Sequence, residues 1–219
     1  MVIYFLSWDG IYQRDLENFR DHGDEGEIWF GTACERRVVG WLKKAFPAPE
    51  GIAVMDLGCG NGHFTAKLLE AGFNPLGALD YSQAAVTLAE QLISSHTDAL
   101  LGKDISIYPA DILDPQSIPE SDKYHVIVDK GTFDAISLSG KDTVTDLAPA
   151  LKATLKRLSR PVSPGQKPLF IITSCNWTGP ELKNIFAPEL TPVGEIEHSS
   201  FTFGGKKGQD VSTIIFEIN

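Results

Sequence analysis

The sequence predicts an α/β fold in which a mostly parallel sheet carries helices on both faces and ends in an antiparallel hairpin. Three observations indicate this class. Short apolar runs alternate with helical segments from residue 52 to residue 187. Glycines follow the first apolar run, where a strand would turn into a helix. The last two strand-like segments, 190–198 and 211–218, have no helix between them, so we expect them to be antiparallel.

Residues 1–50 are predicted to form a helical lid and residues 51–219 the main domain, as two parts of one structural domain. Apolar residues at spacings of four, four and three predict a helix over 8–20, which a polar, glycine-broken loop follows. Thr32 and Glu35 have the spacing of a capping box, in which each side chain binds a backbone N–H at the start of a helix. We therefore expect a second helix to begin at Thr32.

The main domain is predicted to contain five strands that alternate with helices before the closing hairpin. Pro149 falls within the helix expected after the fourth strand and is expected to disturb it. The predicted strands are 52–57, 76–79, 105–108, 124–128 and 169–173, and the predicted helices are 63–71, 82–95, 142–158 and 179–187.

The charge balance is acidic, with a formal net charge of −10. Such a surface repels a phosphate backbone, so no nucleic acid is expected as a partner, and a basic protein or a neutral small molecule fits better. We expect no contact with a membrane, because no apolar run reaches the length of a signal peptide or a membrane span. The three cysteines form no Cys-x-x-Cys pair, which indicates neither a disulfide framework nor a metal site. We expect a monomer in the cytoplasm, with the nucleus as a second compartment.

The first predicted strand is followed by a glycine-rich segment, Asp56-Leu-Gly58-Cys-Gly60-Asn-Gly62. Glycine allows a positive φ and lets a ligand approach the backbone closely. A dinucleotide fingerprint would place its third glycine where this sequence has His63, and a P-loop would need Gly-Lys-Ser/Thr. Both are absent, so the segment indicates a cofactor without a pyrophosphate, and a tight turn without a ligand is the alternative.

Two further carboxylates are expected at the same edge of the sheet. Asp80 ends the second predicted strand, 24 residues after Asp56, and can accept hydrogen bonds from both hydroxyls of a ribose. Asp111 follows the third strand and can accept from an adenine amine, although an acid at such a place is often a helix cap. Three acids at one carboxyl edge favour S-adenosylmethionine, whose amino group Asp56 would face.

The fourth predicted strand ends in Asp129-Lys-Gly-Thr-Phe-Asp-Ala135, and the fifth in Ser174-Cys-Asn-Trp177. Enzymes that methylate amide or adenine nitrogens usually carry Asn/Asp-Pro-Pro-Tyr/Phe after strand four, and its absence argues against that class. Asp129 is a candidate to orient an amine or remove its proton, with capping of the turn as an equal alternative. Asn176 and Trp177 are candidates for a substrate channel, where the indole can hold a lysine by cation–π attraction; core packing is the alternative for Trp177.

Together these segments resemble the eukaryotic translation elongation factor 1-alpha lysine methyltransferase family, in the branch called methyltransferase-like protein ten in animals. The similarity spans nearly the whole chain but not residues 1–7. Beyond the motifs above, the matching segments are Trp8-Asp-Gly-Ile-Tyr12, Gly23-Asp-Glu-Gly-Glu-Ile-Trp-Phe-Gly31, Asp80-Tyr-Ser82 and Phe201-Thr-Phe-Gly-Gly205.

The resemblance implies a seven-stranded class I methyltransferase (Rossmann-like) fold, with S-adenosylmethionine as cofactor and S-adenosylhomocysteine as product. It also implies a lysine of elongation factor 1-alpha as the substrate. The alternatives are methylation of another protein or of a small-molecule amine or hydroxyl, and a scaffold that binds the cofactor without catalysis. The residues expected at the cofactor are Trp29, Asp56, Gly58, Gly60, Asn61, Asp80, Tyr81, Ser82, Asp111, Ile112 and Asp129.

Overall fold

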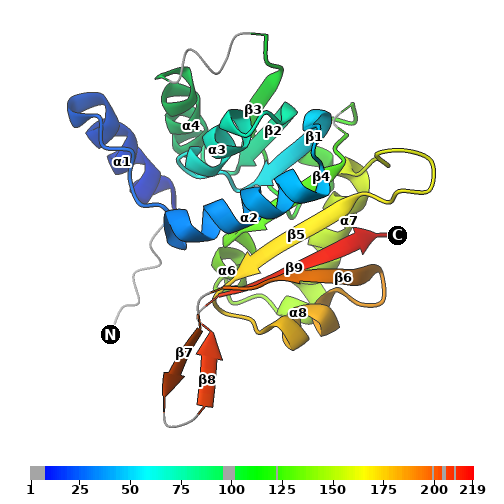
Figure 1. Cartoon of the computed structure of the whole chain (residues 1–219). Coiled ribbons are helices and arrows are strands. Elements are labelled where there is room, and N and C mark those ends of the chain that lie inside the picture. Colours follow the sequence, from blue (N-terminus) through cyan, green and yellow to red (C-terminus); the bar gives the residue numbers. More distant parts are fainter. Residues whose placement is uncertain (1–7, 96–101, 122, 199, 204–205, 210) are drawn as a thin grey trace.

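A single sheet of seven strands forms the centre of the molecule in the computed structural model, which describes residues 8–95, 102–121, 123–198, 200–203, 206–209 and 211–219. The strands are β1 (Glu50–Leu57), β2 (Asn74–Asp80), β3 (Ile105–Pro109), β4 (Val126–Lys130), β5 (Leu169–Ser174), β6 (Leu190–Ile196) and β9 (Ser212–Ile218). Their order is β3-β2-β1-β4-β5-β9-β6 (Figure 1). Strands β1 to β5 are parallel, and β9 lies antiparallel between β5 and β6. The predicted class and the closing antiparallel strand are confirmed.

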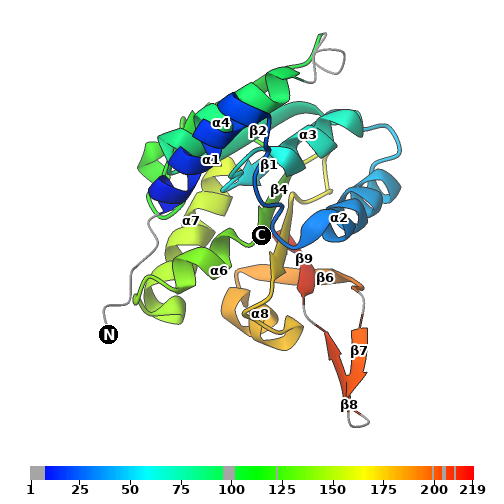
Figure 2. The same ribbon diagram turned by 90° about the vertical axis from the view of Figure 1, so that its left-hand side faces the viewer.

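Helices cover both faces of this sheet (Figures 1 and 2). The longer ones are α1 (Trp8–His22), α2 (Gly31–Ala45), α3 (His63–Glu70), α4 (Gln83–Ser95), α7 (Ala148–Leu158) and α8 (Gly179–Phe186). Successive residues of a strand point to opposite faces. Val54 of β1 therefore joins the apolar cluster under α2, α3 and α4, and Met55 joins the cluster under α7 and α8. Burial on both faces explains why the strands are continuous apolar runs.

The N-terminal helices are attached to the main domain in different ways. Helix α1 packs along α4, where Arg20 Nε donates a hydrogen bond of 3.3 Å to Gln91 Oε1. Helix α2 contributes Val38 and Leu42, both fully buried, to the same core cluster as Phe64 of α3. The predicted lid thus includes one helix that is part of the core. That residues 1–50 form a lid over the cofactor stays a prediction.

The predicted capping box at Thr32 is wrong. Helix α2 begins at Gly31, after Phe30 with a left-handed φ of 61°, and the Phe30 side chain makes no capping hydrogen bond. Thr32 lies inside the helix, and Glu35 is buried in contact with His63. The spacing Thr-x-x-Glu occurs inside helices as well as at their starts, so spacing alone does not locate the first residue.

Short elements account for the other differences from the sequence predictions. The segment predicted as one helix over 142–158 is divided into a π-helical turn, η2 (Thr143–Leu147), and α7, with Pro149 in the first turn of α7. A six-residue helix, α6 (Thr132–Ser137), follows β4. A 3-10 turn, η1 (Pro115–Ser117), lies between β3 and β4. A two-stranded ribbon of β7 (Ser200–Phe203) and β8 (Lys206–Gln209) lies between β6 and β9, in the segment that joins the two strands of the predicted hairpin.

The helices of the described part of the chain are all too short or too polar to cross a membrane. Residues 1–7 and 204–205, the latter within a segment that carries the family resemblance, lie outside the described residues.

Candidate active site

Three buried carboxylates lie at the carboxyl ends of neighbouring strands. Asp56, Asp80 and Asp129 belong to β1, β2 and β4, and each is at most 5% exposed. The sheet order reverses at β1, which has β2 on one side and β4 on the other. Open α/β sheets bind ligands in the crevice at such a reversal. The structure therefore brings these three predicted residues to the edge where a ligand site is expected.

The glycine-rich loop after β1 has no room for a Cβ at Gly58, Gly60 or Gly62. Gly58 and Gly62 have positive φ values of 65° and 80°. A Cβ at Gly58 would lie 2.1 Å from Thr132 Oγ1, and one at Gly62 would lie 2.7 Å from Cβ of Ala89 in α4. Thr132 Oγ1 also donates a 2.7 Å hydrogen bond to the Leu57 carbonyl. The loop is thus packed between α4 and α6, and the lack of a Cβ at Gly58 and Gly62 allows this close approach.

Asp80 joins the glycine loop to the start of α4. Its Oδ2 accepts a hydrogen bond from the Gly60 amide at 3.1 Å, and its Oδ1 accepts one from the Ser82 amide at 3.0 Å. Burial raises the pKa of Asp80, although these two bonds lower it. A carboxylate offers about four acceptor positions, so lone pairs remain for hydroxyls of a ligand. The Tyr12 hydroxyl of α1 lies against Gly60, 2.6 Å from the position that a Cβ of this residue would take. It therefore covers the glycine loop beside Asp80.

Asp56 is buried and, among the described residues, makes one side-chain hydrogen bond. Thr65 Oγ1 donates to its Oδ2 at 2.7 Å. Burial raises its pKa to about 6, while the Thr65 bond and the nearby Lys130 ammonium lower it. A buried carboxylate with a raised pKa is typical of a functional site, since folding alone gains nothing from it. Its charge suits an ammonium group of a ligand.

We expect the Asp56→Asn variant to be more stable than the wild type at neutral pH. The raised pKa means that the folded state binds the proton more tightly than the unfolded chain, so the wild type loses stability as the pH rises from the ordinary value of 3.8 through about 6. The asparagine oxygen still accepts from Thr65 and does not ionise. The free energy of unfolding, measured with urea, should favour the variant by about 2 kcal/mol more at pH 7 than at pH 4. If the free energies of unfolding of the two proteins changed with pH in the same way, burial would not raise the pKa of Asp56.

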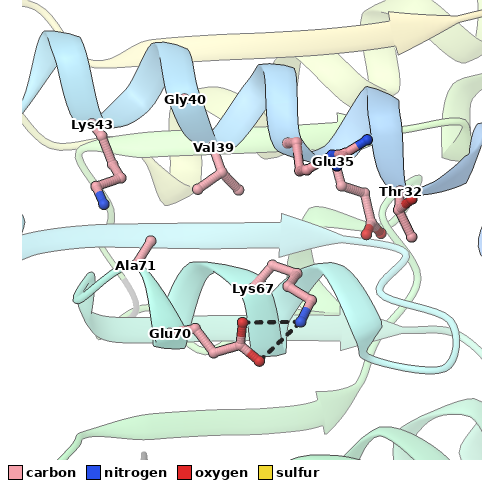
Figure 3. Close-up of a pocket in the computed structure, with 9 residues that line it drawn as sticks. Thr32, Glu35, Val39, Gly40, Lys43, Lys67, Glu70 and Ala71 are labelled. Atoms are coloured by element: carbon pink, nitrogen blue, oxygen red, sulfur yellow. Dashed lines mark hydrogen bonds and ion pairs between the residues drawn. The ribbon is translucent and has the colours of Figure 1, made fainter.

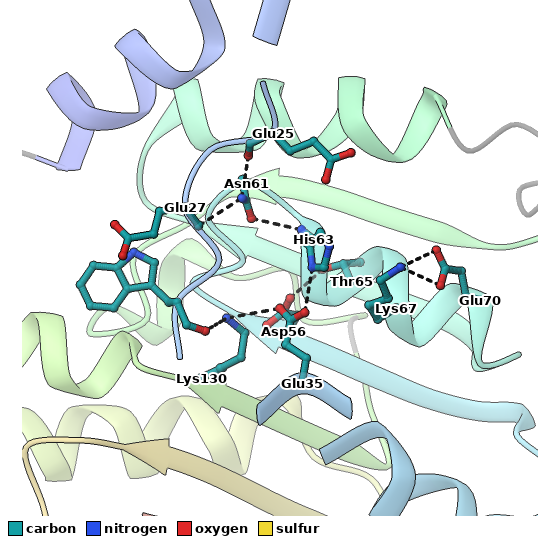
Figure 4. A network of polar contacts seen from close by, with 11 residues as sticks. Glu25, Glu27, Glu35, Asp56, Asn61, His63, Thr65, Lys67, Glu70 and Lys130 are labelled. Carbon is teal, nitrogen blue, oxygen red and sulfur yellow. Dashed lines mark hydrogen bonds and ion pairs between the residues drawn. The ribbon is translucent and has the colours of Figure 1, made fainter. Parts of the chain in front are cut away.

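The loop before α2 is fastened to the glycine loop (Figure 4). Asn61 Nδ2 donates hydrogen bonds to the carbonyls of Glu25, at 2.7 Å, and Glu27, at 3.3 Å. Trp29 packs edge-on against Trp8, with ring centroids 5.1 Å apart, and is 37% exposed. Asn61 and Trp29, both predicted to bind the cofactor, thus lie where the N-terminal segment meets the edge of the sheet. In this conformation the Asn61 amide group holds the N-terminal loop.

The remaining residues predicted at the cofactor, of which Asp111 was expected to meet an adenine amine, differ in their surroundings. Tyr81 is 52% exposed, and Ser82 is fully buried at the start of α4. Asp111 is exposed, and its Oδ1 accepts a 2.8 Å hydrogen bond from the Leu113 amide in its own turn. Ile112 is 5% exposed and belongs to the core cluster under α7. The turn that carries Asp111 follows β3 at the same edge as Asp80, whose carbonyl accepts from the Ala110 amide.

Asp129 caps helix α6. Both its carboxylate oxygens accept hydrogen bonds from the Phe133 amide, and Oδ1 also accepts from the Thr132 amide at 2.9 Å. The residue has no exposed surface, and burial raises its pKa to about 8. Of the two roles suggested by the sequence, the structure thus shows capping of the turn. Contact of Asp129 with a substrate amine stays a prediction.

A second network joins the two motifs at the ends of β4 and β5. Asp134 accepts hydrogen bonds from Ser174 Oγ at 2.5 Å and from the Cys175 amide at 2.8 Å. Ser174 Oγ in turn accepts from the amides of Asn176, at 3.1 Å, and Trp177, at 3.0 Å. Asp134 thus fixes, through Ser174, the backbone of two predicted site residues, Asn176 and Trp177.

Asn176 and Trp177 differ in their surroundings. Asn176 is exposed at the sheet edge. Trp177 is half-buried, its ring lies 6.4 Å from that of Phe133, and its indole N–H is buried with no hydrogen-bond partner in the described part of the chain. Core packing therefore accounts for one side of this ring. An unpartnered buried donor is unusual and leaves a hydrogen bond to be made with another molecule.

The sequence reasoning missed the buried pair of Glu35 and His63. Glu35 lies on the apolar face of α2 with Val38 and Leu42, three and seven residues further along. A glutamate on the buried face of a helix was the available signal. Glu35 also lines the end of a groove of about 600 Å³ between α2 and α3 (Figure 3). None of the residues predicted to bind the cofactor lines this groove.

Comparisons with known proteins agree with this geometry. A family model described as "Methyltransferase domain" matches residues 49–212. The chain is 39% identical over 210 residues to a Danio rerio protein named "EEF1A lysine methyltransferase 2", which covers 96% of this chain and 84% of that protein. It is 36% identical over 230 residues to "Protein-lysine N-methyltransferase efm4" of Schizosaccharomyces pombe, covering 97% and 92%. Magnesium protoporphyrin IX methyltransferase from Synechocystis PCC 6803, solved with bound SAM, shares the fold with a TM-score of 0.62 at 14% identity, over 100% of both chains.

Proposed function

Because this chain belongs to the methyltransferase family that includes these lysine methyltransferases, we propose that it transfers a methyl group from S-adenosylmethionine to a lysine of translation elongation factor 1-alpha. This choice of substrate is supported by the similarity to relatives that are named as lysine methyltransferases, one of them of EEF1A. The chain is 39% and 36% identical to them over nearly its whole length. The acidic net charge of −10 suits a basic protein partner. We further propose that the protein acts as a monomer in the cytoplasm or the nucleus, without nucleic acid.

The residues at the sheet edge fit this cofactor. Asp80 has lone pairs for ribose hydroxyls, and the glycine loop beside it has no Cβ at Gly58, Gly60 or Gly62. Asp56 offers a buried negative charge for the ammonium of the amino-acid part. When bound, S-adenosylmethionine supplies an electrophilic methyl group on a sulfonium. The protein contributes orientation and a setting with little water.

The substrate lysine must lose its proton before its nitrogen can attack. With a reference pKa of about 10.4, the neutral form costs roughly 4.6 kcal/mol at pH 7. Desolvation of the ammonium reduces this cost. We propose that Trp177 and Asn176 form the mouth through which the side chain enters, with the indole face against the lysine. Asp134 holds both backbones in place through Ser174.

The decisive experiment is incubation of the purified protein with S-adenosylmethionine and purified elongation factor 1-alpha, followed by mass spectrometry of peptides. We expect mass increases of one or more methyl groups on lysine, and none when the cofactor is omitted. A parallel reaction with whole-cell lysate and labelled cofactor tests the alternatives. Label in another protein or only in small metabolites would reject elongation factor 1-alpha as the substrate, and no label at all would reject the hypothesis of an enzyme.

A further inference from the structure

A buried network of charged side chains fastens the N-terminal segment to the carboxyl edge of the sheet (Figure 4). We propose that Glu35 and Lys130 act as positioning residues, which hold the Trp29–Phe30 turn in place and thereby set the affinity for the cofactor. The inference rests on the proposed cofactor and adds two residues that the sequence did not assign to its site. Neither residue needs to touch the cofactor for this role.

Glu35 is the centre of the network. Its Oε2 lies 2.7 Å from Nδ1 of His63, the first residue of α3 after the glycine loop. Its Oε1 lies 3.7 Å from Nζ of Lys130, the last residue of β4. One side chain of α2 thus contacts both the glycine-loop helix and the strand that ends in Asp129.

Lys130 extends the network to the backbone of the N-terminal turn. Its Nζ donates a hydrogen bond to the Trp29 carbonyl at 3.2 Å. The next residue, Gly131, packs against the Phe30 ring, since a Cβ there would lie 2.9 Å from that ring. The Trp29–Phe30 turn therefore rests on the residues that follow β4 and is tied to them by one cationic side chain.

Burial makes the loss of one partner more costly here than in a surface ion pair. The side chains of Glu35, Lys130 and His63 are 2%, 12% and 11% exposed. Exposed ion pairs contribute little, but removal of one partner from a buried pair leaves an uncompensated charge. Glu35 Oε1 makes no hydrogen bond within the described residues, so Lys130 at 3.7 Å is the charge that compensates it. Loss of the Lys130 ammonium should therefore disturb α2 and the turn before it.

The test compares Lys130→Met, Lys130→Arg, Glu35→Gln and the double variant Glu35→Gln/Lys130→Met. We expect Lys130→Met and Glu35→Gln each to raise the Kd for S-adenosylhomocysteine about tenfold in calorimetry, and Lys130→Arg to stay within about threefold of the wild type. The double variant should bind about as weakly as each single one, because both act through the same turn. It also carries no unpaired buried charge from this pair, so it should fold even where a single variant does not.

Amide hydrogen exchange of residues 23–31 gives a readout that does not need the cofactor. Exchange there should accelerate in Lys130→Met and not in Lys130→Arg. The control is Lys67→Met, which breaks the exposed pair of Lys67 with Glu70 on α3 and should change neither measurement. Equal losses in the methionine and arginine variants, additive effects in the double variant, or unchanged exchange would overturn the proposal. Failure of the wild type to bind S-adenosylhomocysteine would instead reject the proposed function, and the exchange data would still test the network.

Discussion

The Asp80→Ala variant is expected to bind S-adenosylhomocysteine at least about 100-fold more weakly than the wild type. A hydrogen bond to a charged acceptor contributes about 1.5–3 kcal/mol, and Asp80 is placed to accept two from a ribose. The variant also removes the acceptor of the Gly60 and Ser82 amides, which position the glycine loop against α4. Both losses act on affinity in the same direction.

Calorimetric titration of the purified variant with S-adenosylhomocysteine measures this effect directly. Asp80→Asn serves as an intermediate, because the amide keeps one oxygen acceptor but loses the charge, and it should bind more tightly than Asp80→Ala. Glu120→Ala, which removes an exposed carboxylate from the loop before β4, should bind as the wild type does. A Kd for Asp80→Ala within about threefold of the wild type would mean that the ribose lies elsewhere.

The sequence revealed Asp56 and Asp80 because each combines two local signals, an apolar run and an acid at its end. The carboxyl ends of parallel strands meet at one edge of the sheet, so the predicted topology was enough to place the two acids near each other. Glu35 was misassigned because its partners, His63 and Lys130, are 28 and 95 residues away in the chain and nothing local identifies them. Burial of a charged side chain is decided by those distant partners.

Asp129 shows a different limit of sequence reasoning. An acid directly after a strand has the same surroundings in the sequence whether it caps a turn or meets a substrate. Only the hydrogen bonds from Thr132 and Phe133, and the absence of exposed surface, show that its oxygens are used by the backbone. The same holds for Trp177, where contact with Phe133 accounts for one face of the ring and leaves its N–H without a partner in the described chain.

The Gly62→Ala variant is expected to lose about 2–5 kcal/mol of unfolding free energy. Gly62 precedes α3 with a φ of 80°, a left-handed conformation that costs an L-residue about 1–2 kcal/mol. A Cβ there would also lie 2.7 Å from Cβ and 2.8 Å from Cα of Ala89. The second atom belongs to the backbone of α4, so no side-chain rotation relieves the clash. Overpacking of this kind costs about 1–3 kcal/mol.

Urea unfolding of Gly62→Ala and of a matched variant, Gly40→Ala, separates this contact from a general effect of added methyl groups. Gly40 lies within α2, and a Cβ added there would have no atom within 4 Å, so alanine should stabilise the protein by up to about 1 kcal/mol. A Gly62→Ala protein as stable as the wild type would mean that α4 moves away without cost. If α4 cannot move, the close approach of Gly62 to Ala89 fixes the position of the glycine loop relative to Asp80, and the same substitution should weaken cofactor binding as well.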